Sequence, residues 1–292
     1  MINSRSTPLL IRKLVRELLV GLSKLGVKTA SLDYHGLKVK IPLIHGMGRF
    51  HFVPDFSTWQ KNNLAAVARL WPEKTVVDIG ANVGQFLLNL KSVNQDLKYI
   101  GFEPNPPCIF YLYELIRLNM FSNTHVFPVA VSMTDGISYL HSNAWDSGTS
   151  TLIEGFSPSK AEYSTSIYAV SGDKFLSALP DDFSFIKIDV EGFEYEVLKG
   201  IKETLKSRRP VVFCEVLTNI RNNQQVKNNV RDIYELAEEL RLAIYKPSSE
   251  SMPVKVDSIE DFNCAFSQDY IFVPEEKAAT YLGQFTLPPP AR

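Results

Sequence analysis

The stretch Thr75-Val-Val-Asp-Ile-Gly-Ala-Asn-Val-Gly-Gln-Phe86 decides how this chain of 292 residues folds. It begins with an apolar run that favours a buried strand carrying Asp78 near its end. The chain then turns at Gly80 and Gly84, residues that permit a tight backbone path close to a ligand. Residues 84–92 follow with a helical pattern, and the N-terminal amides of a helix can meet an anionic group. This order of strand, glycine turn and helix is typical of a nucleotide-cofactor loop.

The spacing of the glycines distinguishes between cofactors. The dinucleotide pattern G-x-G-x-x-G, counted from Gly80, requires glycine at positions 82 and 85. This chain has Asn82 and Gln85 there, so two of the three required glycines are absent. The turn also lacks the Lys of a triphosphate-binding loop. The observed pattern Asp-x-Gly-x-x-x-Gly suits S-adenosylmethionine better. An NAD(P)-dependent oxidoreductase on the same architecture is the second enzyme hypothesis.

A carboxylate follows at the end of the next predicted strand. The segment Lys98-Tyr-Ile-Gly-Phe-Glu103 is apolar until its last residue. A Glu at this position can accept hydrogen bonds from both hydroxyls of a ribose, which is the role of an acid after a glycine loop in dinucleotide sites. The alternative is a solvated acid at a strand end. We expect Glu103 to bind the cofactor.

Three segments resemble the FkbM family of class I S-adenosylmethionine-dependent methyltransferases. They are residues 76–84 (VVDIGANVG), residues 101–106 (GFEPNP) and above all residues 185–200 (FIKIDVEGFEYEVLKG). The third segment is the most specific, and the resemblance covers residues 70 to 217. It implies O-methylation of a hydroxyl on a small molecule or saccharide. It also implies a cofactor site formed by Asp78, Gly80, Asn82, Gly84, Glu103, Asn105, Ala130 and Asp189.

The rest of the chain alternates between strand and helix patterns, which predicts a doubly wound, mostly parallel α/β sheet of seven strands. The expected strands are 75–79, 98–103, 125–131, 184–190, 210–217, 242–245 and 269–273. The expected helices are 84–92, 106–119, 193–205 and 227–241. A polar stretch at 143–151 is predicted to be an active-site loop.

This pattern divides the chain into a methyltransferase domain over residues 71–275, an N-terminal extension over 1–70 and a C-terminal tail over 276–292. The extension is expected to be helical and looped and to cap part of the acceptor site. Residues 8–26 are rich in Leu, but charged residues interrupt every run long enough to be a signal peptide or a membrane span. An amphipathic helix packed on the domain and a basic helix lying on a membrane surface both fit this pattern.

Ligands of such sheets bind beyond the carboxyl ends of the strands, so the acids at these ends should lie along one rim. Asp189 and Glu191 are two residues apart, can point to one side, and are the predicted catalytic pair that removes the acceptor proton. Asp189 with Glu215 could also bind Mg²⁺ or Ca²⁺. The alternative makes Asp189 a rim acid bonded to backbone amides, and Glu191 an acid at a helix N-terminus. His45, in a glycine-containing loop, is a further candidate base.

Composition narrows the class of partner. The chain is 45% apolar and has a net charge of −1, so it can bury a sizeable core and has no overall basic excess for nucleic acid. Its three Cys are widely separated, which indicates neither disulfides nor a zinc cluster and favours the cytoplasm. A third hypothesis is a non-catalytic scaffold on the same fold, but the intact acids and glycines argue against it.

Overall fold

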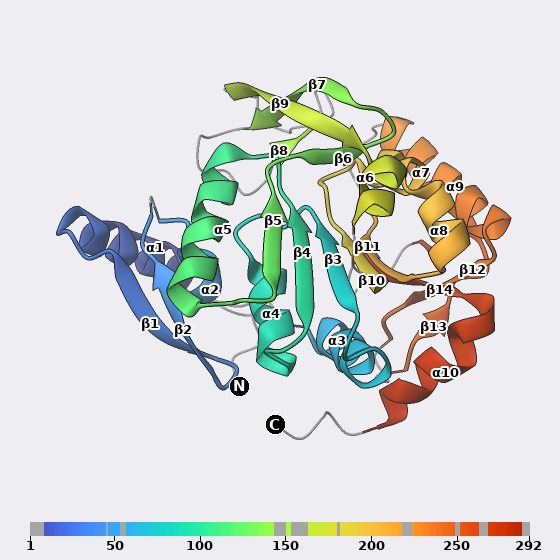
Figure 1. The fold of residues 1–292 in the computed structure, drawn as a ribbon, viewed down its shortest axis with the longest axis horizontal. Coiled ribbons are helices and arrows are strands. Elements are labelled where there is room, and N and C mark those ends of the chain that lie inside the picture. The colour runs from blue at the N-terminus through green and yellow to red at the C-terminus, as the bar shows by residue number, and fades with distance from the viewer. Residues whose placement is uncertain are drawn as a thin grey trace.

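The computed structural model describes residues 9–44, 46–52, 57–142, 150–152, 163–179, 182–217, 224–248, 252–262 and 268–287. A large sheet crosses the centre of the molecule, with helices on both of its faces (Figure 1). Its strand order is β13-β12-β14-β11-β10-β3-β4-β5. The strands are β3 (Thr75–Ile79), β4 (Lys98–Phe102), β5 (Thr124–Phe127), β10 (Phe183–Ile188), β11 (Val211–Glu215), β12 (Leu242–Lys246), β13 (Val254–Lys255) and β14 (Asp269–Pro274).

This sheet confirms the predicted doubly wound α/β fold. β5, β4, β3, β10 and β11 are mutually parallel, and β14 runs antiparallel to both of its neighbours, β11 and β12. The seven predicted strands are all present, and the two-residue β13 adds an eighth at the edge beside β12. The strand order reverses between β3 and β10, which is where sheets of this kind bind their ligands.

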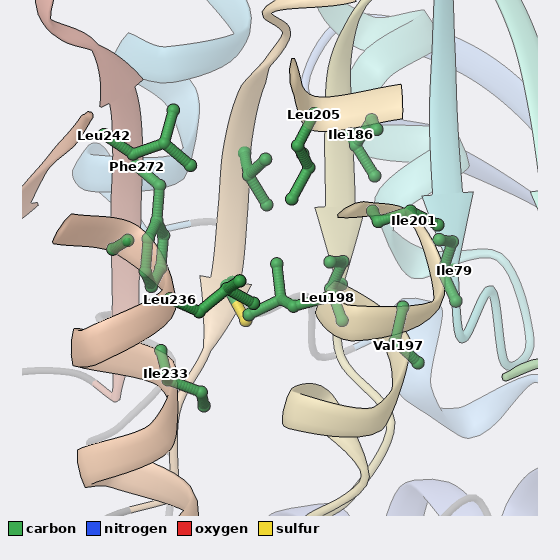
Figure 2. Packing of buried hydrophobic residues seen from close by; sticks show 14 of the residues in the cluster. Ile79, Ile186, Val197, Leu198, Ile201, Leu205, Ile233, Leu236, Leu242 and Phe272 are labelled. Carbon is green, nitrogen blue, oxygen red and sulfur yellow. The ribbon is translucent and has the colours of Figure 1, made fainter. Parts of the chain in front are cut away.

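Successive side chains of each central strand enter cores on opposite faces of the sheet, as the pleat requires. One core lies under α6 (Gly172–Ala178), α7 (Glu194–Gly200), α8 (Lys202–Arg208) and α9 (Gln224–Glu239). Figure 2 shows this core, where Val197 lies near Ile79, and Leu236 lies beside Leu198 and Phe272. The other core lies under α3 (Thr58–Leu70), α4 (Gln85–Val93) and α5 (Pro106–Asn119).

Two predicted elements need correction. The strand expected at 125–131 ends at Phe127, because Pro128 has no N–H to donate to a neighbouring strand. The chain then enters a second sheet, in the order β6-β9-β7-β8. The helix expected at 193–205 is divided into α7 and α8 on either side of Ile201. The second sheet consists of β6 (Ala130–Ser132), β7 (Gly136–Ser142), β8 (Ser150–Thr151) and β9 (Tyr163–Ser171).

The N-terminal extension contains α1 (Leu9–Lys24), the hairpin of β1 (Thr29–Tyr34) and β2 (Leu37–Pro42), the short α2 (Arg49–Phe52) and α3. The hairpin packs on α4 and α5 through a separate apolar core that includes Tyr34, Ile41 and Tyr111. The Tyr34 hydroxyl donates to Asn89 Oδ1 of α4 at 2.7 Å. Within the described residues, no helix is both long and apolar enough to cross a bilayer.

The segment expected to be a C-terminal tail packs on the domain. It forms the 3₁₀ turns Glu275–Lys277 and Gly283–Thr286 around α10 (Ala278–Leu282). Tyr281 is fully buried in the core beneath α3, and its hydroxyl donates to Asn63 Oδ1 at 2.8 Å. The remaining turn, at Ile259–Asp261, is capped by Ser258.

Candidate cofactor site

The glycine turn after β3 is shaped mainly by contacts with the chain itself. Gly80 has a φ of +86°, and a Cβ there would lie 1.8 Å from the carbonyl oxygen of Asp189. Gly84 has a φ of +84°, and its Cβ would lie 2.8 Å from Leu112 of α5. The amides of Gly80 and Ala81 both donate to the Phe102 carbonyl. The glycines therefore allow β3, β4 and β10 to end close together, and the ligand-approach role expected of them stays a prediction.

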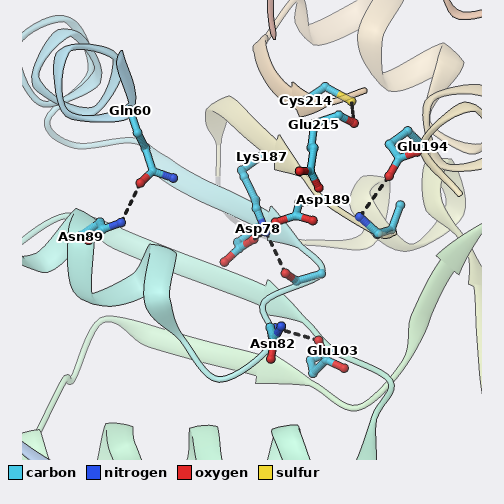
Figure 3. A network of polar contacts seen from close by, with 12 residues as sticks. Gln60, Asp78, Asn82, Asn89, Glu103, Lys187, Asp189, Glu194, Cys214 and Glu215 are labelled. Atoms are coloured by element: carbon cyan, nitrogen blue, oxygen red, sulfur yellow. Dashed lines mark hydrogen bonds and ion pairs between the residues drawn. The ribbon is translucent and has the colours of Figure 1, made fainter. Parts of the chain in front are cut away.

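Asp78 is placed beneath this turn, outside the pocket. It is fully buried, accepts a hydrogen bond from the Tyr99 hydroxyl at 2.6 Å and forms an ion pair with Lys187 at 3.0 Å. Lys187 Nζ also donates to the Gly80 carbonyl at 2.7 Å and lies 3.4 Å from Asp189 Oδ2 (Figure 3). One buried cation thus joins the ends of β3 and β10.

Lys187 is a site residue that our sequence reasoning missed. Burial disfavours its ammonium form, but Asp189 and Asp78 more than offset burial and raise the pKa of Lys187 above its ordinary value. The signal was available, because Lys187 is the single charged residue in the apolar run Phe183–Ile188. A buried charge requires a partner of opposite sign, and Asp78 was the nearest candidate on an adjacent strand.

Glu103 follows β4 and is held by the backbone on both of its carboxylate oxygens. The Asn82 amide donates to Oε2 at 2.7 Å, and the Asn105 amide donates to Oε1 at 2.8 Å. Burial raises the pKa of Glu103 to about 7, although the two amides oppose the shift. A carboxylate oxygen has two lone-pair sites, so each oxygen keeps capacity for a ligand hydroxyl.

A pocket with an empty volume of about 630 Å³, including its open mouth, lies at the carboxyl ends of β3, β4 and β10. The structure brings seven of the predicted site residues to its wall, namely Gly80, Asn82, Glu103, Asn105, Ala130, Asp189 and Glu191. Much of the remaining wall is apolar and was not predicted, notably Ile79, Phe102, Val129, Val131, Leu140, Leu152, Val190 and Phe193. Ser150, of the predicted polar loop, also lines it, whereas residues 143–149 lie outside the described residues.

Among the described residues, three predicted site residues do not line this pocket. Asp78 lies beneath the turn, Gly84 ends the turn at the start of α4, and Glu215 lies next to Asp189 at the end of β11 (Figure 3). His45 lies outside the described residues, so its proposed role as a base stays a prediction. The described part of residues 1–70 also contributes nothing to the wall, and its capping role likewise stays a prediction.

Three acids gather at the rim beside Lys187. Burial and the adjacent Asp189 raise the pKa of Glu191 to about 7, and its backbone is left-handed, with a φ of 53°. Burial, Asp189 and a hydrogen bond between the two carboxyl groups raise the pKa of Glu215 to about 11. The Glu215 carboxyl group is therefore held in its protonated form beside Asp189.

The predicted Mg²⁺ or Ca²⁺ site is not supported. Among the described residues, no group of three or more His, Cys, Asp or Glu side chains is arranged to hold a metal ion. Asp189 and Glu215 are hydrogen-bonded to each other.

Comparisons with known proteins agree with this architecture. The model of the methyltransferase FkbM domain matches residues 78–247. Methyltransferase sdnD of Sordaria araneosa is 29% identical over 165 residues, which are 47% of this chain and 64% of that protein. The chain thus spans less than two thirds of the curated relative that it matches.

Solved structures show more distant similarity. Methyltransferase FkbM from Methylobacillus flagellatus KT is 14% identical with a TM-score of 0.45, over 89% of this chain and 58% of that one. The O-methyltransferase from Bacillus cereus in complex with SAH is 11% identical with a TM-score of 0.42, over 90% and 91%. Because the family model matches more than half of its residues, the chain belongs to the FkbM methyltransferase family.

Proposed function

We propose that this methyltransferase transfers the methyl group of S-adenosylmethionine to a hydroxyl of a small molecule or saccharide. The observation that carries the proposal is Glu103, whose two oxygens are fixed by backbone amides at the wall of the pocket. A carboxylate held in this way is prepared to accept both hydroxyls of a ribose. Membership of a methyltransferase family supports this proposal over the oxidoreductase and scaffold alternatives considered from the sequence.

The residues of the pocket fit the chemical parts of this cofactor. Asn105 and Ala130, with the apolar side chains around them, offer a slot for adenine. Glu103, Asp189 and Glu191 give the wall an acidic character, and no Lys or Arg lines it among the described residues. Such a wall favours a sulfonium and an ammonium group, and it would repel the pyrophosphate of a dinucleotide.

When bound, S-adenosylmethionine supplies an activated methyl group, and the protein must align the acceptor and accept its proton. Asp189 and Glu191 both face the pocket. The pKa of Glu191, about 7, lies where a general base works at neutral pH. As the acceptor oxygen forms its bond to the methyl carbon, the bond from that carbon to sulfur breaks, and we propose that the hydroxyl proton passes to Glu191.

Glu191→Gln tests this assignment. We expect kcat to fall about 100-fold or more, the usual contribution of a general base, while affinity for S-adenosylhomocysteine stays within about twofold. The rise of kcat through neutral pH should also disappear. The exposed Glu73→Gln is the matched control. An unchanged kcat and pH profile in Glu191→Gln would leave Asp189 as the remaining described candidate.

Calorimetric titration tests the cofactor assignment directly. The purified protein is titrated with S-adenosylhomocysteine, and with NAD and NADP under identical conditions. The proposal predicts micromolar binding of S-adenosylhomocysteine alone. Binding of a nicotinamide nucleotide in preference would refute it, as would binding of none of the three by a protein shown to be folded.

A further inference from the structure

The charge of the chain is divided unevenly along its length. The first 50 residues contain nine Lys and Arg against two Asp and Glu, a net charge of +7. The whole chain contains 31 against 32, so residues 51–292 contain 22 against 30, a net charge of −8. A basic segment attached to an acidic body suggests a partner with negative charge. The cofactor site does not account for it, because no described residue before Ile79 lines the pocket.

The same segment exposes large apolar side chains. Leu14 and Leu18 of α1 are 59% and 62% exposed, and Leu25, just after the helix, is 81% exposed. Leu18 follows Leu14 by four residues, about one helical turn, so α1 presents both on one side. The Leu25 amide donates to the Gly21 carbonyl, so Leu25 continues the last turn of the helix, about three turns from Leu14. Leu19 is buried and faces the body of the protein. The helix is thus attached along one side, while Leu14 and Leu18 remain in contact with water.

This apolar surface continues past the end of α1. Val27 is exposed and lines a groove whose opposite wall is Phe110 of α5, itself 58% exposed. Pro42, Leu43 and Ile44 line the groove between them. Lys24 and Lys28 are exposed beside the apolar residues. In Figure 1, α1 and the β1–β2 hairpin project to one side of the molecule, next to α5.

We propose that this surface, formed by Leu14, Leu18, Leu25 and Val27 with Lys24 and Lys28, docks on an anionic lipid bilayer. Its leucines would enter the boundary between headgroups and acyl chains, and its basic residues would be attracted to the negative surface. Exposed leucines contribute nothing to binding a phosphate backbone, so nucleic acid fits less well. A second copy also fits less well, because a two-fold contact would bring two net charges of +7 together.

Vesicle co-sedimentation of the full chain tests the proposal. The probes are vesicles of phosphatidylcholine alone and of phosphatidylcholine with phosphatidylglycerol, each at low and high salt. We expect binding to the anionic vesicles at low salt, weaker binding at high salt, and little binding to neutral vesicles. Leu18→Ser should weaken binding about tenfold or more, since a buried Leu side chain contributes at least that factor.

Two matched controls separate this surface from general effects. Ile137→Ser removes an apolar side chain that is 75% exposed on β7 and should bind vesicles like the wild type. Lys24→Glu with Lys28→Glu should abolish the preference for anionic lipid, whereas Lys98→Glu with Lys206→Glu, also exposed, should not. All variants are first checked for wild-type thermal unfolding.

Several results would overturn the proposal. They are equal binding to neutral and anionic vesicles, no binding to either, and binding that Leu18→Ser leaves unchanged. Dimerisation in sedimentation velocity that Leu18→Ser abolishes would assign the surface to a second copy. Binding to single-stranded RNA in preference to vesicles would assign it to nucleic acid.

Discussion

Glu103 is the residue on which the cofactor assignment depends most. Its pKa of about 7 in the folded protein lies above the usual value of 4.5. The stability contributed by its buried, protonated form is therefore present below pH 4.5 and is lost as pH rises through 7. Ribose hydroxyls donate to the ionised form, so affinity for S-adenosylhomocysteine should rise as pH passes through 7.

Glu103→Gln should weaken the binding of S-adenosylhomocysteine about 10- to 150-fold. This factor is equivalent to about 1.5–3 kcal/mol, the usual contribution of hydrogen bonds to a charged group. The pH dependence of affinity should disappear with it. Titrations of the wild type, Glu103→Gln and the exposed Glu73→Gln between pH 6 and 8 measure both effects. If the variant keeps wild-type affinity, Glu103 does not hold the ribose.

His51 makes the stability of the folded protein depend on pH in the acid range. It is fully buried and its ring stacks on Tyr111, and burial lowers its pKa from 6.5 to about 4. Between these values the unfolded chain binds more protons than the folded one, so stability falls as pH falls from 6.5 to 4. The full loss amounts to about 3 kcal/mol.

Replacing the imidazole by an aromatic ring that cannot titrate should remove this contribution. We expect His51→Phe to flatten the pH dependence of the free energy of unfolding, measured in urea between pH 4.5 and 7, whereas exposed His125→Gln should not. A slope that persists in His51→Phe would show that other groups cause it.

At the scale of elements, the contact between the ends of β3 and β10 determines the shape of the site. The Asp189 amide donates to the Ile79 carbonyl at 3.0 Å, and the Asp189 carbonyl occupies the space that a side chain at position 80 would need. Gly80→Ala should therefore lower the free energy of unfolding by about 3 kcal/mol or more, because the clash and the positive φ both destabilise the folded state. Gly136→Ala, which meets nothing within 4 Å, should change stability by less than about 1 kcal/mol. Equal melting temperatures for the two variants would contradict this account.

The strands and most helices could be predicted because their signals are local. α5 has the bounds expected from its sequence, since Pro106 and Pro107 suit a first helical turn. The break between α7 and α8 could not be predicted, because Val197, Ile201 and Leu205 enter the same core on both sides of it and keep the helical period unbroken. The end of β5 had a signal in Pro128, which our reading of 125–131 as one strand overlooked.

The site was predictable only where it follows the ends of strands. Asp189 and Glu103 were found because the carboxyl ends of parallel strands meet at one rim. Leu140 lies on β7 of the second sheet and Leu152 directly follows β8, and the position of this sheet beside the pocket depends on pairings between segments distant in sequence. Asp78 has the sequence position of a ligand-binding acid, but its partner Lys187 lies 109 residues further along the chain.

At the scale of the whole molecule, the C-terminal segment closes the core beneath α3. Tyr281 is fully buried and packs against Trp71 and Phe285. Tyr281→Ala should lower the free energy of unfolding by about 3–5 kcal/mol, as for other large buried aromatic residues. Leu287→Ala, at a side chain that is 48% exposed, is the control and should have little effect. Urea unfolding measures the free energy of unfolding of both variants. If Tyr281→Ala lowers it only slightly, this segment does not stabilise the core and behaves as a tail.

The whole molecule brings a fixed carboxylate, an apolar slot and two rim acids to one pocket at the switch point of its sheet. The most direct test of this account is a crystal structure of the protein with S-adenosylhomocysteine. We predict that both ribose hydroxyls donate to Glu103, and that the sulfur faces Asp189 and Glu191. A cofactor bound elsewhere, or bound in this pocket with its ribose away from Glu103, would contradict the account.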